Sequence, residues 1–155
     1  MKKLTILSIL AVIVLSACGS MNQTNTPELK FAPKLTMYEE GIVHFEVGVL
    51  NQSSQKFSGK KDINIQVIVT DDDGKIRNQM QILDLGAIAA NDEIVPFTSD
   101  AEYEAGQYIA SLTGEGIPSL SVPFEIREDA GVRSLAAPPD FIDPGTEFTI
   151  IDPDL

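Results

Sequence analysis

The chain has 155 residues, a formal net charge of −12 from 23 acidic and 11 basic residues, one Cys and one His. This length is typical of a single domain. The acidity argues against a nucleic-acid-binding surface, which needs clustered Lys and Arg. A single Cys excludes an intramolecular disulfide framework and a multi-Cys zinc site. We therefore expect no nucleic-acid partner, no metal site and no cofactor.

The first 18 residues form a targeting segment. Lys2 and Lys3 precede an apolar stretch from Leu4 to Leu15, and small residues lead from there to Cys18. The apolar stretch is too short for a membrane span and lies next to a small-residue cleavage signal. The run Leu15-Ser16-Ala17-Cys18 resembles the lipobox of bacterial lipoproteins.

This resemblance implies a helical signal peptide over residues 1–17 and a Cys18 that carries diacylglycerol and a further acyl chain such as palmitate. Several acyl chains give stable anchoring, whereas one chain alone binds a membrane only marginally. The protein would then lie in the cell envelope, on the outer side of the cytoplasmic membrane or in the outer membrane. Two alternatives stay open: a free Cys18 in a secreted protein, and an uncleaved anchor.

Residues 18–34 are expected to be the lipidated tether, because residues 20–27 are polar and end in a proline. Loss of residues 1–17 would leave 9 basic and 23 acidic residues, a formal charge of −14. Anionic headgroups would repel such a domain.

Residues 35–127 show alternation of apolar and polar residues with a period of two, which is typical of half-buried strands. Turn residues separate the runs, and no stretch has a helical period. Asp73-Gly74 indicates a hairpin turn, and Pro96 indicates an edge strand or a bulge. The pattern predicts an all-β antiparallel sandwich of seven or eight strands. The strands are expected at 35–38, 43–49, 63–69, 75–81, 82–88, 94–98, 107–113 and 120–126.

One motif refines this prediction. Glu104, Gly106 and Tyr108 are spaced as in the segment that opens strand F of immunoglobulin domains, which this run resembles. In that family the tyrosine hydroxyl bonds back to the main chain as a tyrosine corner. Ala110 stands where the family has its disulfide cysteine, and the chain has no Trp. The resemblance therefore implies an immunoglobulin-like or fibronectin-III-like sandwich and excludes an antibody-type domain.

Residues 128–155 form an acidic, Pro-rich tail that we expect to be disordered. Within it, the run Phe141-Ile142-Asp143-Pro144 recurs as Ile150-Ile151-Asp152-Pro153. The alternatives are a pair of short recognition motifs or an added strand at 147–151. We therefore count Phe141, Ile142, Ile150 and Ile151 among the candidate partner-binding residues.

The polar stretch 52–61 supplies the other candidates, Phe57, Lys60 and Lys61, in one loop between two strands. Loops of a sandwich often carry recognition, so an exposed Phe57 would be a contact residue; the alternative is a loop anchor that folds back. Asp71–Gly74 lacks ligands at the positions of a calcium loop, which favours a hairpin turn over weak calcium binding.

Catalytic groups are scarce in this sequence. His44 falls on the face opposite Val43 and Phe45, so it is expected to be exposed, and no partner for acid–base or nucleophilic work lies near it in sequence. The paired acids are expected to form a solvated face. We therefore predict no catalytic residue and a non-catalytic binding or structural module with a protein partner.

An inhibitor or accessory subunit is the first alternative function, and an enzyme is the second. The inhibitor alternative comes from a resemblance in the order of motifs to bacterial immunoglobulin-like proteinase inhibitors. The matching motifs are Phe45-x-Val47, Asn51-Gln52-Ser53, Asp73-Gly74-Lys75 and Gly106-x-Tyr108.

Overall fold

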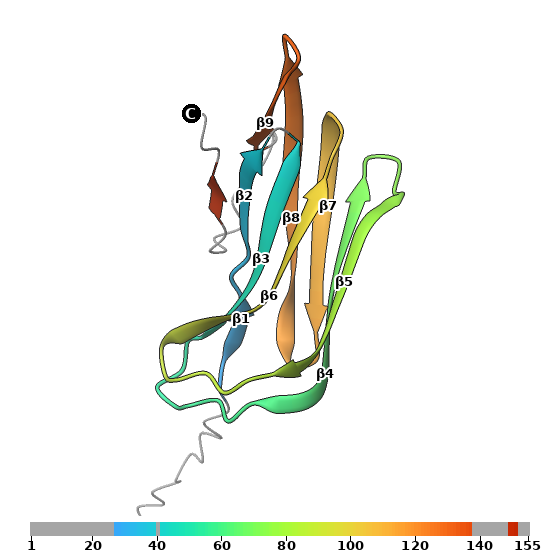
Figure 1. Cartoon of the computed structure of the whole chain (residues 1–155). Coiled ribbons are helices and arrows are strands. Elements are labelled where there is room, and N and C mark those ends of the chain that lie inside the picture. Colours follow the sequence, from blue (N-terminus) through green and yellow to red (C-terminus); the bar gives the residue numbers. More distant parts are fainter. Residues whose placement is uncertain (1–26, 40, 138–148, 152–155) are drawn as a thin grey trace, which may run out of the picture.

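The computed structural model describes residues 27–39, 41–137 and 149–151. These residues contain ten strands and no helix. The strands form two sheets that pack face to face (Figure 1). In chain order they are β1 (Leu29–Phe31), β2 (Lys34–Glu39), β3 (Ile42–Asn51), β4 (Lys60–Asp71), β5 (Ile76–Leu85), β6 (Asp92–Glu102), β7 (Gly106–Gly114), β8 (Ile117–Asp129), β9 (Val132–Ala136) and β10 (Thr149–Ile151).

Strand β3 is the centre of the first sheet. β6 pairs with one edge of β3 along its length, and β1 and β2 share the other edge. β10 adds to β2 in parallel, whereas every other described pair is antiparallel. The second sheet has the order β5-β4-β7-β8-β9, also antiparallel. β6 and β5 are thus edge strands of their sheets.

The alternation seen in the sequence places one apolar face of each sheet against the other. The largest fully buried side chains come from both sheets, and they form one hydrophobic core. The predicted all-β antiparallel sandwich is confirmed, but the described residues contain ten strands where seven or eight were expected. The largest of these side chains are Phe124, Leu35, Ile63, Ile65, Ile88, Leu112, Ile126 and Leu135.

Two local predictions are also confirmed. The Asp71–Gly74 segment is a tight turn in which Gly74 N donates to Asp71 O over 3.0 Å, and Gly74 has a φ of 77°, which glycine adopts without strain. Pro96 lies in an edge strand, at a point where the register between β3 and β6 shifts by one residue. A proline is tolerated there because its missing N–H interrupts no central ladder.

The strand boundaries differ from the prediction in two places. The stretches 75–81 and 82–88 were expected to be separate strands, but β5 runs unbroken through most of both. β6 is eleven residues long, well beyond the expected 94–98. Much of β6 is exposed, since it pairs on only one side, and its weak alternation hid its true length.

The sandwich also extends beyond the expected limits of 35–127. β1 lies in the predicted tether, and β8, β9 and β10 reach into the predicted tail. Leu29, Phe31 and Leu135 are all buried in the core. Strands of three to five residues are too short to show a period of two, which is why the sequence pattern missed them. Residues 1–26, including the expected signal helix, lie outside the described residues.

Candidate functional site

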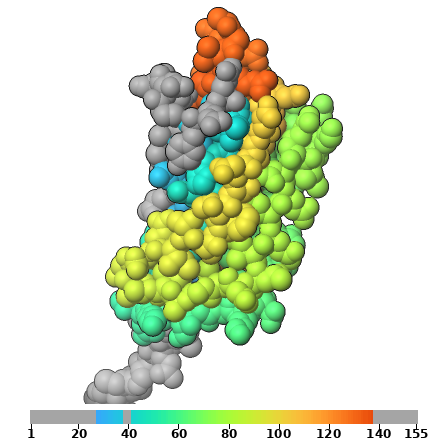
Figure 2. Space-filling view, in the orientation of Figure 1, coloured from blue at the N-terminus to red at the C-terminus, as the bar shows by residue number. Residues whose placement is uncertain are grey.

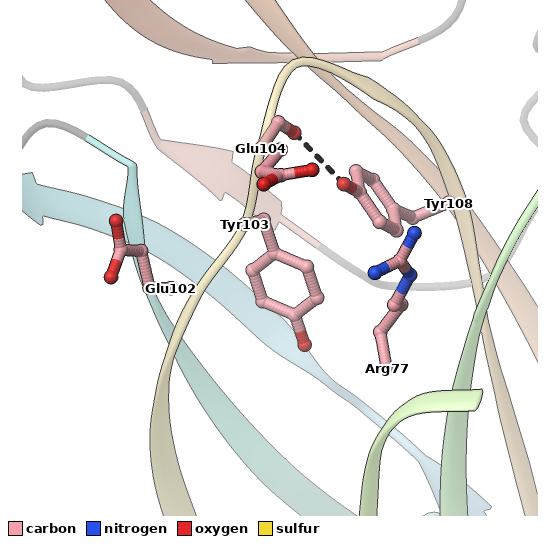
Figure 3. Close-up of a pocket in the computed structure, with 5 residues that line it drawn as sticks. All are labelled: Arg77, Glu102, Tyr103, Glu104 and Tyr108. Carbon is pink, nitrogen blue, oxygen red and sulfur yellow. Dashed lines mark hydrogen bonds between the residues drawn. The ribbon is translucent and has the colours of Figure 1, made fainter. Parts of the chain in front are cut away.

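The tyrosine corner is present as the sequence motif implies. Tyr108, near the start of β7, donates its hydroxyl hydrogen to the main-chain oxygen of Glu104 over 2.8 Å (Figure 3). Its ring stacks on Phe124 of β8 at a centroid distance of 5.3 Å, and Tyr103 meets it edge-on at 4.9 Å. These three aromatic rings close one end of the hydrophobic core.

An open hollow of about 290 Å³ lies beside this corner. Arg77 at the start of β5, Glu102 at the end of β6, Tyr103 and Glu104 in the following turn, and Tyr108 line it (Figure 3). Two segments that are far apart in sequence meet here: the start of β5, and residues 102–108, which run from the end of β6 through a turn into β7. The hollow was not predicted, because it depends on how the two sheets are stacked.

Arg77 is held in place by Asp71, the last residue of β4. Its Nε donates to Asp71 Oδ2 over 2.7 Å, and Lys75 N donates to Asp71 Oδ1 over 2.8 Å. Burial acts to raise the pKa of Asp71, but these two hydrogen bonds and the Arg77 charge outweigh it and hold that pKa below its usual value. The hydrogen bond to Asp71 likewise raises the pKa of Arg77. The pair is therefore charged throughout the neutral range.

The two tyrosines in the hollow stay protonated at neutral pH. Burial raises the pKa of Tyr103, against the opposing effect of a hydrogen bond with Asn78. Burial also raises the pKa of Tyr108, and the charges of Arg77 and Glu104 act in opposite directions on it. Both hydroxyls therefore keep their hydrogen and can act as hydrogen-bond donors at neutral pH.

The charge balance of the hollow is negative. Glu104 and Glu102 add two carboxylates to the Asp71–Arg77 pair, and Arg133 Nη1 lies 3.7 Å from Glu102 Oε1. Among these five side chains, three carboxylates face two cations. The excess continues along the chain, since residues 78–126 contain eight Asp and Glu and no Lys or Arg.

Replacing Asp71 with Asn is expected to lower the melting temperature at pH 7. A carboxylate whose pKa is depressed by folding stabilises the fold above its unfolded pKa, near 4, and loses that effect as the pH falls through its folded pKa. The melting temperatures of wild type and Asp71→Asn should therefore differ above pH 5 and converge only as the pH falls through the lowered pKa of Asp71. Asp72→Asn, in the exposed part of the same turn, is the matched control and should follow the wild type.

The candidate residues from the 52–61 stretch lie at the other end of the molecule (Figure 1). Phe57 forms an antiparallel bridge with Ile88, with both N–O distances 2.9 Å, and its half-buried side chain packs against the core. These contacts favour the loop-anchor interpretation. Lys60 and Lys61 begin β4 and are not part of the loop, and Lys60 Nζ lies 2.7 Å from Glu115 Oε1.

Of the four candidate residues in the tail, the structure describes two. Ile150 and Ile151 belong to β10, where they are register partners of Leu35 and Thr36. Residues 149–151 therefore form a strand, which agrees with the alternative of an added strand at 147–151 and not with disorder of these three residues. Phe141 and Ile142 lie outside the described residues, as does Cys18.

The expectation that His44 is exposed is wrong. Its side chain is only 17% exposed, and Nδ1 lies 2.6 Å from Asp100 Oδ1 while Nε2 lies 3.7 Å from Glu46 Oε1. The reason is topological: β3 is flanked by β2 and β6, so outward side chains on β3 are covered by cross-strand neighbours.

Asn51, at the end of β3, is a buried polar residue, a role that its place in the Asn51-Gln52-Ser53 motif did not predict. Its Nδ2 donates to the main-chain oxygens of Gln55 at 2.7 Å and Ala89 at 3.0 Å, and Ile88 O lies 3.3 Å away. Its Oδ1 accepts from the main-chain N–H and the hydroxyl of Ser53. The side-chain amide of Asn51 thus connects the loop that contains Ser53 and Gln55 with the loop that contains Ala89.

Two features are absent from the described ranges, 27–39, 41–137 and 149–151: a metal-binding cluster and a membrane-spanning helix. No group of three His, Cys, Asp or Glu side chains there lies close enough to hold a metal ion. Among the same residues, there is no helix with the length and hydropathy needed to cross a membrane.

Comparison with known proteins gives a structural similarity only. No protein-family model matches the chain, and no curated protein sequence matches it. The CARDB domain of a Pyrococcus furiosus protein, solved in complex with di-metal ions, is similar in structure with a TM-score of 0.37 and 14% sequence identity. The similar region covers 82% of this chain and 97% of that chain.

Proposed function

We propose that this protein is a lipid-anchored bacterial envelope protein whose β-sandwich is a non-catalytic binding module. The observation that carries the binding role is the hollow at the tyrosine corner. It is open, and the buried rings of Tyr103 and Tyr108 form part of its wall. Its lining has two carboxylates, Glu102 and Glu104, and one cation, Arg77, so its net charge is negative. Such a hollow suits a cationic group on a protein partner.

The position of β1 is consistent with an anchor at Cys18. Leu29 pairs with Asn51, at the end of the sandwich that carries the 52–59 loop, whereas Ile42 and Glu102 pair at the end that carries the hollow. Ten residues separate Cys18 from Leu29, and an extended chain of that length spans at most about 35 Å. The hollow would thus face away from the membrane, where a partner can reach it.

The anchor is tested by metabolic labelling with an alkyne analogue of palmitate. Label is expected in the wild type and not in Cys18→Ala, because the chain has no other cysteine. Ser20→Ala, two residues after Cys18, is the matched control and should be labelled like the wild type. Label in Cys18→Ala, or a mature chain that begins elsewhere, would refute the lipoprotein assignment.

The binding role is tested separately, by a photo-cross-linking amino acid placed at Glu104 in living cells. A discrete cross-linked product is expected from position 104. The same group at Glu115, which is exposed on the β7–β8 turn at the opposite end, should give none. Equal products from both positions, or none from position 104, would contradict a binding site at the hollow.

A further inference from the structure

Among the strands that the structure describes, β5 is a long edge strand with few features that oppose pairing with another strand. It pairs only with β4, and the register is regular from Ile65↔Ile82 to Val69↔Asn78, with one register shift beyond each end of this stretch. Its ten residues contain no proline and no lysine, and its charges, Arg77 and Asp84, balance. Figure 1 shows β5 at the margin of the molecule with no strand beyond it.

The other described edges have the features by which proteins block strand addition. β1 and β10 have three residues each, and β9 has five. β6 is long, but it contains Pro96, a register shift and four acidic residues. β5 is ten residues long, has neither proline nor lysine, and keeps a regular register over residues 78–82, so it is a candidate for strand addition by a partner.

The side chains around β5 indicate which residue types a partner strand would need in order to bind there. Leu83 and Ile76 of β5 are 53% and 54% exposed, and Phe97 on the neighbouring edge of β6 is 36% exposed, so apolar side chains would be buried there. β6 lies beside β5 (Figure 2) and contributes Asp92, Glu93, Asp100 and Glu102. The hollow with Glu102 and Glu104 opens at the start of β5.

We propose that the free edge of β5 accepts an extended segment of a partner protein in which apolar and basic residues alternate. The segment would add a sixth strand to the β5-β4-β7-β8-β9 sheet. A Lys or Arg near its end would enter the hollow between Glu102 and Glu104. This inference rests on the proposed binding role and gives the partner's chemistry.

A second copy of this chain does not fit that chemistry. Each copy has a formal charge of −12, and each would bring the acids of its own β6 to the same edge. Like charges brought together in this way oppose association. A basic segment would instead be attracted, because its positive charges would neutralise the carboxylates of β6 and of the hollow.

The probe is the peptide acetyl-(Lys-Val)₄-amide, titrated into the full-length protein in neutral detergent by isothermal calorimetry. Binding is expected to weaken at least tenfold between 50 and 300 mM salt, because screening reduces the attraction of exposed charges. The charge-reversed peptide acetyl-(Glu-Val)₄-amide should not bind. A Lys-Val peptide with N-methylated valines keeps the charge but cannot form the strand ladder, and it should not bind either.

Variants locate the site. Gln79→Lys and Gln81→Lys place charge on the exposed side of β5 and should weaken binding about tenfold. Thr113→Lys and Ser121→Lys, exposed on the interior strands β7 and β8, are matched controls and should bind like the wild type. Circular dichroism and melting temperatures of all four variants show that they are folded.

Three outcomes would overturn the inference. Equal affinity for the N-methylated peptide would show that only charge is recognised, and unchanged affinity in both Gln variants would place the peptide elsewhere. A dimer of the free protein that Gln81→Lys dissociates would assign the edge to a second copy. A cross-link from position 104 together with any of these would keep the proposed binding role and reject the added strand.

Discussion

Replacing Tyr108 with alanine is expected to destabilise the sandwich by about 3–5 kcal/mol, the usual loss when a buried aromatic is truncated to alanine. The ring is buried, stacks on Phe124 and meets Tyr103 edge-on, so its removal leaves a cavity bordered by both rings. For a domain of this size the melting temperature should fall by roughly 12–20 °C. Thermal unfolding followed by circular dichroism measures it.

Tyr108→Phe separates the hydrogen bond from the packing. It keeps the ring and removes only the 2.8 Å bond to Glu104 O, so the expected loss is about 1 kcal/mol. Gln107→Ala, an exposed neighbour on β7, should leave the melting temperature unchanged. If Tyr108→Ala melted with the wild type, the ring would contribute nothing to the core and the strand F assignment would fail.

Asn51→Ala is expected to lower the free energy of unfolding by roughly 2–4 kcal/mol, because each buried polar group left without a partner costs about 1–3 kcal/mol. Asn51 is fully buried, and its amide bonds to Gln55 O, Ala89 O and Ser53. No alanine can replace these bonds, so both loops lose their common attachment. The melting temperature should fall by roughly 8–16 °C.

Asn51→Asp is the sharper test of this hydrogen-bonding pattern. The carboxylate keeps the size of the side chain and can still accept from Ser53, but it cannot donate to Gln55 O and Ala89 O. It should therefore destabilise at pH 7 at least as much as alanine does. An Asn51→Asp variant as stable as the wild type would mean that the amide does not hold the two loops. Gln52→Ala, next in sequence, is the control.

Much of this fold could be predicted from the sequence, because strands buried on one face carry their own signal. The alternation at Val43, Phe45, Val47 and Val49 placed β3, and the Asp-Gly turn placed the hairpin that joins β4 and β5. Tyr108 was identified because a tyrosine corner is a local motif, with donor and acceptor four residues apart. Local signals of this kind can be read from one chain.

The rest depended on contacts between distant residues. Arg77, Glu102 and Glu104 line one hollow only because the stacking of the two sheets places the start of β5 beside the end of β6. His44 is covered because β3 lies between β2 and β6. The order of strands in a sheet cannot be predicted from the hydrophobic pattern of a single strand. β1 and β9 escaped notice because their few residues show no period, although Phe31 and Leu135 are buried.

Amide hydrogen exchange along β5 tests the binding account most directly. In the free protein, the amides of β5 that bond to β4 should exchange slowly, and the alternate amides on the free edge should exchange quickly. With saturating acetyl-(Lys-Val)₄-amide, the account predicts that the free-edge amides between Ile76 and Leu85 become slow, while those of β6 change little. Protection confined to other strands, or no change in β5 at saturation, would contradict it.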